Sequence, residues 1–123
     1  MSAEWTEEEI LEYLNRASAY QRVFLAALAH LEREPAPISE IVLLLRKISA
    51  KTGRWWIRTN TAGQEIGGAY SGLIRRRKNL GKTEDIVERV LDERTGEPLF
   101  RLNEKYKDAV IKWLKEKGLW IKR

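Results

Sequence analysis

The first third of the chain has apolar residues at helical spacing. These residues are Ile10, Leu11, Leu14, Tyr20, Phe24, Leu25, Leu28 and Leu31. A recurrence every three to four residues is typical of an amphipathic helix. The pattern predicts a helical region from Thr6 to Glu34, with residues 15–18 as the candidate break between a short arm and a longer core helix. Thr6 followed by Glu9 is a capping box, which marks the expected start.

A second helical pattern follows the sequence Glu34-Pro35-Ala36-Pro37. Proline lacks an N–H and disfavours helix in the residue before it, so this segment should end the first helical region. Ser39 is the expected N-cap of the second helix, and Gly53 suits the left-handed position that would end it. The residues expected on its buried face are Ile41, Val42, Leu44, Leu45 and Ile48.

A third helix is predicted from Thr61, or the residues beside it, to Leu80, with Gly81 after its C-terminal end. Before it lies Trp55-Trp56-Ile57-Arg58, which is β-prone or an ordered loop. The residues expected on the core face of the third helix are Ile66, Tyr70, Leu73, Ile74 and Leu80.

The remaining chain reads as a hairpin and a final helix. Two β-prone runs, 85–91 and 97–102, flank the turn sequence 92–96 and predict a β-hairpin. Asn103 is the expected N-cap of a helix that runs to about residue 117 and ends at Gly118. Its expected stripe is Tyr106, Val110, Trp113 and Leu114. The apolar tail 119–121 has no evident docking site. The fold class is therefore mainly α with a β-hairpin.

Composition describes a single intracellular domain. The chain has 123 residues and no cysteine, which excludes disulfides and thiolate zinc sites. Apolar runs such as Ile41–Leu45 are far shorter than the roughly 20 residues of a membrane span. The acidic N-terminus is unlike a secretion signal. We expect a cytoplasmic protein without membrane contact.

Positive charge is concentrated in one stretch. Residues 51–82 contain eight Lys and Arg against a single Glu, whereas residues 1–50 have a net charge of −3 and residues 83–123 of +1. A patch of one sign repels itself, and a polyanionic partner is its common explanation. A solvated face without any partner is the alternative.

The order of three helices, a hairpin and a last helix resembles the winged helix-turn-helix superfamily of small archaeal and bacterial regulators. The likeness covers about residues 18–117, between an acidic helical arm (1–17) and an apolar and basic tail (118–123). It is carried by the sequences Tyr20–Leu25, Pro37–Ile41, Ile66–Arg77 and Phe100–Asn103. The resemblance implies a double-stranded DNA-binding protein, with helix 61–80 in the major groove and the 85–102 hairpin as its wing. The connection at about 53–60 is longer than a simple helix-turn-helix turn.

The third helix has the chemistry that a major groove requires. Opposite its expected core face lie Gln64, Gly68, Ser71 or Gly72, Arg75 and Lys78, a small polar surface that ends in cations. Gln64 can pair bidentately with adenine and Arg75 with guanine. The three glycines at 67, 68 and 72 each weaken a helix by about 0.5–1 kcal/mol. They suggest close backbone approach, either to DNA or to a neighbouring helix.

The other cations are assigned mainly to phosphate. Four consecutive cations span about 300° of a helix, so residues 75–78 cannot all meet one duplex. Arg77 is expected to point away and pair with an acidic residue of the first helix. The candidates for phosphate contact are Arg54, Arg58, Arg76, Lys78 and Lys82, and at the hairpin tip Arg94 could reach phosphate or the minor groove.

Other functions stay open at this stage. Trp55 and Trp56 could stack on exposed bases in an RNA- or ribosome-associated protein, or could both pack under the basic helix. The basic helix could also hold an acidic partner in a protein assembly. A homodimer through the N-terminal arm or the final helix is plausible. His30, the sole histidine, is expected to be structural or solvent-facing, and no motif indicates an enzyme, a metal site or a cofactor.

Overall fold

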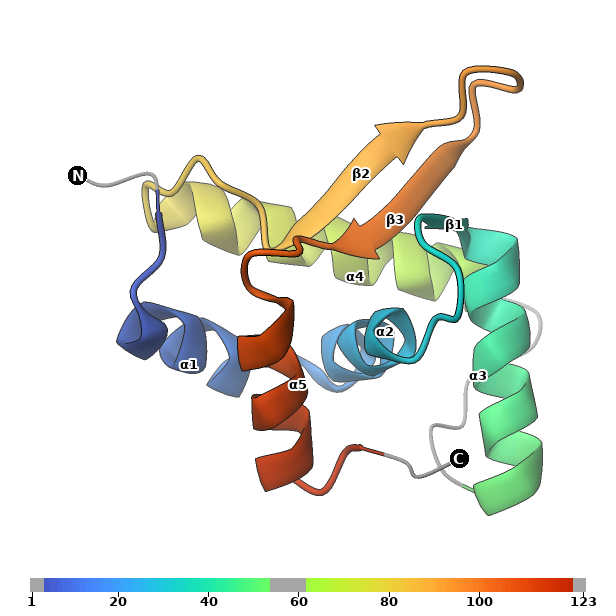
Figure 1. The fold of residues 1–123 in the computed structure, drawn as a ribbon, viewed down its shortest axis with the longest axis horizontal. Coiled ribbons are helices and arrows are strands. Elements are labelled where there is room, and N and C mark those ends of the chain that lie inside the picture. Colours follow the sequence, from blue (N-terminus) through green and yellow to red (C-terminus); the bar gives the residue numbers. More distant parts are fainter. Residues whose placement is uncertain (1–3, 54–61, 121–123) are drawn as a thin grey trace.

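A computed structural model describes residues 4–53 and 62–120, which form five helices and a three-stranded antiparallel sheet (Figure 1). This confirms the expected helical fold with a hairpin. The elements are α1 (Glu7–Asn15), α2 (Ala19–Ala29), β1 (Ala36–Pro37), α3 (Ile38–Thr52), α4 (Ala62–Asn79), β2 (Val87–Leu91), β3 (Pro98–Leu102) and α5 (Lys107–Glu116).

Two capping boxes divide the first helical region into α1 and α2. In the first, the Thr6 hydroxyl accepts from Glu9 N and the Glu9 carboxylate accepts from Thr6 N, as predicted. In the second, Ser18 and Gln21 make the same reciprocal pair. The break predicted at residues 15–18 is therefore confirmed, and its cause is a second helix start with its own cap. The second helix ends at Ala29, five residues earlier than expected.

The proline segment forms an edge strand that the sequence pattern did not predict. Ala36 pairs with Phe100 and Pro37 with Leu99, which gives the strand order β1-β3-β2. Pro37 is then the N-cap of α3, without a side-chain cap, so the prediction that Ser39 would cap this helix is wrong. The strand leads directly into the helix and leaves no residues for a separate cap. Gly53 ends α3 with φ of 70°, as predicted.

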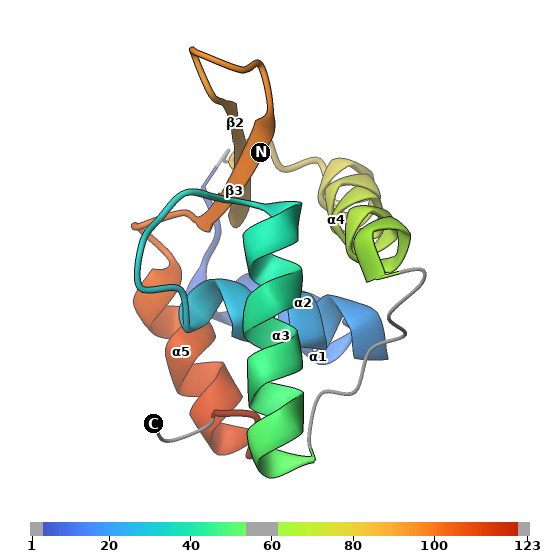
Figure 2. The ribbon, with the colours of Figure 1, turned by 90° about the vertical axis from the view of Figure 1, so that its right-hand side faces the viewer.

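An aromatic cluster holds α4 against α2 and the sheet. The ring centroid of Phe100 on β3 lies 5.9 Å from that of Phe24 on α2 and 4.9 Å from that of Tyr70 on α4. Both pairs have edge-to-face geometry, which aromatic rings prefer. Figure 2 shows the consequence: α4 and the hairpin lie beside each other along one side of the molecule, while α3 runs across the direction of α4.

The final helix closes the other side of the core. Tyr106, Val110, Trp113 and Leu114 are all buried, as the stripe predicted. The N-cap is Tyr106, however, so the prediction for Asn103 is wrong; Asn103 instead bridges Asp85 O and Lys105 N in the preceding turn. The tail has a docking site after all, because the ring of Trp120 lies 4.2 Å from that of His30. Among the helices described here, none is long and apolar enough to cross a membrane.

Candidate nucleic-acid interface

One face of α4 is a continuous exposed stripe. Gln64, Gly68, Ser71, Arg75 and Lys78 are all exposed. Their spacing of three or four residues places them along a single line on the helix. Ile66 and Leu73 are buried on the opposite face, as predicted, whereas Leu80 is 51% exposed and its assignment to the core is wrong. Leu80 lies after the last helical residue, where the core-facing periodicity no longer applies.

The first half of this stripe is small and unobstructed. A β-carbon added to Gly68 would find no heavy atom within 4 Å, so helix packing does not require glycine there. The hydroxyl of Ser71 donates to the backbone oxygen of Gly67 at 3.1 Å and therefore lies along its own helix. A ligand could therefore approach the backbone of α4 closely at these residues.

Gly72 has a different role. A β-carbon there would lie 2.6 Å from Gln21 Nε2 of α2. The alternative of tight helix–helix packing therefore holds for Gly72, and the open surface is left to Gly67 and Gly68, neither of which has an atom within 4 Å of an added β-carbon. Ser71, rather than Gly72, belongs to the exposed stripe.

The second half of the stripe carries two exposed cations, Arg75 and Lys78. Within residues 4–53 and 62–120, neither Arg75 nor Lys78 has a carboxylate within 4.0 Å or a side-chain hydrogen bond. A charge that has no protein partner and is already in water can bind a phosphate without first breaking an ion pair.

The two arginines between them face the protein. Arg76 Nη2 donates to the backbone oxygen of Tyr13 at 2.6 Å, and its guanidinium lies 4.5 Å from the centre of the Tyr13 ring. Arg76 therefore joins α4 to α1, contrary to its assignment to phosphate. Arg77 Nε lies 2.5 Å from Asp85 Oδ1. Arg77 thus has a carboxylate partner as predicted, but that partner precedes β2 and does not lie in the first helix.

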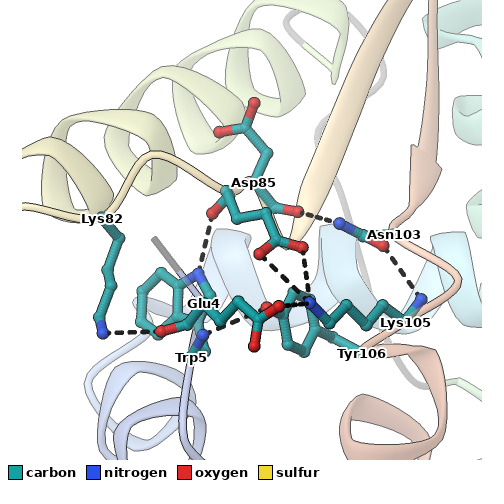
Figure 3. A network of polar contacts seen from close by, with 8 residues as sticks. Glu4, Trp5, Lys82, Asp85, Asn103, Lys105 and Tyr106 are labelled. Atoms are coloured by element: carbon teal, nitrogen blue, oxygen red, sulfur yellow. Dashed lines mark hydrogen bonds and ion pairs between the residues drawn. The ribbon is translucent and has the colours of Figure 1, made fainter. Parts of the chain in front are cut away.

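Lys82 is also removed from the interface. It is 7% exposed, and its ammonium donates to the backbone oxygen of Glu4 at 2.9 Å and lies 2.7 Å from Glu9 Oε2. Figure 3 shows Lys82 directed toward the N-terminal arm. The prediction of a phosphate contact is wrong, because this lysine lies after the end of α4, where the chain turns back over α1.

The same arm is fixed to the base of the hairpin and to α5. Trp5 N donates to the Tyr106 hydroxyl oxygen at 3.1 Å, and Trp5 Nε1 donates to Glu84 O at 2.8 Å (Figure 3). Lys105 Nζ lies 2.7 Å from Glu4 Oε1 and 3.3 Å from Glu84 Oε1. These contacts hold the segment after α4, and so the direction in which the hairpin leaves the core.

The hairpin contributes a cation that sequence reasoning missed. Arg89 is exposed and stands opposite Phe100 in the β2–β3 register. Directly paired residues lie on the same face of a sheet, and the Phe100 ring contacts Tyr70 of α4. Arg89 therefore lies on the side of the hairpin that faces α4. The signal was available, because Arg89 interrupts the apolar alternation of Val87 and Leu91.

The predicted tip residue Arg94 has less favourable surroundings. It is exposed, but Asp92, Glu93 and Glu97 lie within three residues of it in the same turn. The backbone N–H groups of Arg94 and Thr95 both donate to the Asp92 carboxylate, which shapes the turn. An acidic tip repels phosphate, so the side of β2 offers a better contact than its end.

The remaining predictions concern the segment before α4, the sole histidine and the absence of a metal site. Arg54 and Arg58, like Trp55 and Trp56, lie outside the described residues. His30 is buried, with Nδ1 2.7 Å from Ala26 O, so its structural assignment is confirmed. No group of three or more potential metal ligands occurs within the residues that the structure describes.

Comparison with protein-family models, with curated proteins and with solved structures found no match to this chain.

Proposed function

We propose that this protein binds double-stranded DNA as a winged helix-turn-helix protein, in the role of a transcriptional regulator or an architectural protein. The observation that carries the proposal is the exposed stripe of α4. It joins a small surface (Gly68, Ser71) to two cations without partners in the described chain (Arg75, Lys78). This is the combination that lets a helix backbone come near base edges while long side chains reach the phosphates.

The arrangement of elements supports the same interpretation. Helices α2, α3 and α4 precede the β2–β3 hairpin, and α3 runs across α4, as a helix-turn-helix requires (Figures 1 and 2). In the strand order β1-β3-β2, β2 is an edge strand, and the hairpin lies beside α4 (Figures 1 and 2). The one departure is the long connection between Thr52 and Ala62, where a simple helix-turn-helix has three or four residues.

Each residue of the interface has a distinct role in this proposal. Gln64 and Arg75 would contact adenine and guanine edges, because their side chains can make two parallel hydrogen bonds with these bases. Lys78 and Arg89 would bind the phosphates on either side of the groove, from α4 and from the hairpin. Arg54 and Arg58 would add phosphate contacts from the connection before α4.

The test is the salt dependence of duplex binding, measured by fluorescence anisotropy of a labelled duplex. If about six phosphates are neutralised, log affinity should fall with log salt at a slope near −5. The variant Arg75→Glu/Lys78→Glu should abolish binding. The matched control is Lys112→Glu/Lys117→Glu, which changes the same charge at exposed residues of α5 and its C-cap and should bind nearly as the wild type.

Three outcomes would contradict the proposal. A slope near zero would reject electrostatic binding to DNA. Preference for a structured RNA over the duplex in direct competition would favour an RNA-binding role. Equal loss in both double variants would mean that net charge, and not the α4 stripe, governs the interaction.

A further inference from the structure

A groove runs along the outer face of α3, away from the α4 stripe. It has a volume of about 800 Å³ and lies between α3 and residues 30–33, which follow α2. Its apolar lining includes Leu31, Leu44, Ile48 and Leu43, which is 53% exposed. An exposed leucine beside a groove of this size marks a surface suited to a partner.

The groove has opposite charges at its two ends. Glu40 lies in the first turn of α3, and Lys47 and Lys51 lie in the last two turns of the helix, while Glu32 lines the groove from the segment after α2. Arg33 adds a further cation to the lining. A partner that fits must therefore be apolar in its middle, acidic at one end and basic at the other.

The outer face of α1 in the same protein has these features. Its buried residues are Ile10, Tyr13 and Leu14, and the other side exposes Leu11, which is 37% accessible, among glutamates. The exposed glutamates are Glu7, Glu8 and Glu12. The helix is followed by its C-cap Arg16, which is also exposed and forms an ion pair with Glu12 at 3.1 Å. The N-terminal end of α1 is therefore acidic, and its C-terminal end carries the basic residue.

We propose that α1 of one copy docks into the α3 groove of a second copy, with the two helices antiparallel. In this orientation Leu11 meets Leu43, Glu8 lies near Lys47, and Arg16 lies within one helical turn of Glu40. The register agrees: at 1.5 Å per residue, Glu8 lies about 4.5 Å from Leu11 along its helix and Lys47 lies about 6 Å from Leu43 along the other.

The two surfaces lie at opposite ends of the molecule. Figure 1 places α1 at one end of the long axis and α3 at the other. A contact between different patches on two copies is heterologous. It leaves a free α1 at one end of the pair and a free groove at the other. Further copies can therefore add to the pair and form a row. Neither surface uses the exposed stripe of α4. The inference goes beyond DNA binding and does not depend on it.

Sedimentation velocity of the DNA-free full-length chain tests this association. The wild type should show a sedimentation coefficient that rises with concentration and falls again with added salt. Leu11→Arg and Leu43→Arg should each weaken association at least tenfold, because each places a charge in the apolar centre. Mixed in equal amounts, the two variants should form a dimer that grows no further, since one keeps an intact groove and the other an intact α1.

A second test exchanges the charges of two exposed residues, one on each surface. E8K and K47E should each weaken self-association at low salt, and their mixture should restore association to the wild-type extent, because each variant then offers a complementary α1 and a complementary groove to the other. A wild type that stays monomeric at all concentrations would overturn the proposal. So would single variants that associate like the wild type, or two blocked variants that fail to combine. All four variants should keep the duplex affinity of a single copy, so failure here would leave the DNA-binding proposal standing.

Discussion

The ammonium of Lys82 lies 2.7 Å from a carboxylate oxygen of Glu9, and only 8% of the lysine side chain is exposed. Lys78, four residues earlier, is exposed and has no carboxylate within 4.0 Å in the part of the chain described. Two lysines of one basic run thus serve different purposes. Lys82 fastens the N-terminal arm, and Lys78 belongs to the candidate interface.

We therefore expect opposite effects from two alanine substitutions. Lys82→Ala should lower stability by about 1 kcal/mol, because Glu9 and Glu4 O lose a charged donor. It should leave the salt slope of duplex binding unchanged. Lys78→Ala should leave the thermal midpoint unchanged and reduce the magnitude of the salt slope by about 1. Thermal unfolding by circular dichroism and anisotropy titrations measure the two properties separately.

Equal effects of the two variants on either property would contradict this division. Lys82→Arg serves as a control for charge alone. It keeps the charge but cannot place a compact ammonium between Glu4 O and Glu9, so it should recover only part of the lost stability.

The same contact makes stability dependent on acid. The hydrogen bond from Lys82, with a backbone hydrogen bond at Thr6, lowers the pKa of Glu9 to about 2. Because the folded pKa lies below that of the unfolded chain, roughly 4.3, the contribution of Glu9 is complete above about pH 5. It is lost as the pH falls toward 2. Glu9→Gln should lower the thermal midpoint at pH 7 and have little effect near pH 2.

Glu8→Gln is the matched control, because Glu8 is an exposed residue of the same helical turn. Its thermal midpoint should follow that of the wild type across the whole pH range. A difference between Glu9→Gln and the wild type that stays constant from pH 7 to pH 2 would rule out this source of acid sensitivity.

The helices and their faces could be predicted because they depend on local rules. The Thr6 capping box, the left-handed Gly53 and the stripe from Gln64 to Lys78 follow from spacing and residue chemistry within one helix. Each requires only the residues within a few turns of chain. The exposure of that stripe was the main expectation of the sequence analysis, and it holds for all five residues.

The features that the sequence did not predict depend on contacts between distant parts of the chain. Lys82 is a surface cation by composition and becomes buried only because Glu4 and Glu9, more than seventy residues away, lie beside it. The edge strand at Ala36 exists because Phe100 pairs with it. Arg89 gains its importance from a register that the hairpin adopts in three dimensions. No local pattern contains this information.

Two glycines of α4 should respond differently to alanine. Gly68→Ala should raise stability by about 0.5–1 kcal/mol, since the added methyl group enters open space and the helix gains propensity. It should nevertheless weaken duplex binding, because the methyl group stands on the stripe. Gly72→Ala gains the same propensity but forces Gln21, which caps α2 and is 8% exposed, to move.

Thermal unfolding of the two variants distinguishes these roles. Gly72→Ala should fall at or below the wild type in stability, and should bind the duplex as the wild type does once folded. An equal gain in stability for both variants would mean that Gln21 can rotate away freely. Unchanged DNA binding of Gly68→Ala would remove Gly68 from the interface.

The two arginines of the hairpin should also differ. Arg89 lies on the face of β2 directed toward α4, and Arg94 lies among three carboxylates at the tip. Arg89 attracts a phosphate, whereas the carboxylates around Arg94 repel one. Arg89→Ala should therefore weaken duplex binding and lower the magnitude of the salt slope by about 1. Arg94→Ala should change both little. Replacing Glu93 with Gln should strengthen binding slightly if the tip passes near the duplex at all. A larger loss from Arg94→Ala than from Arg89→Ala would show that the tip itself enters the groove, and would require a different tilt of α4 on the DNA.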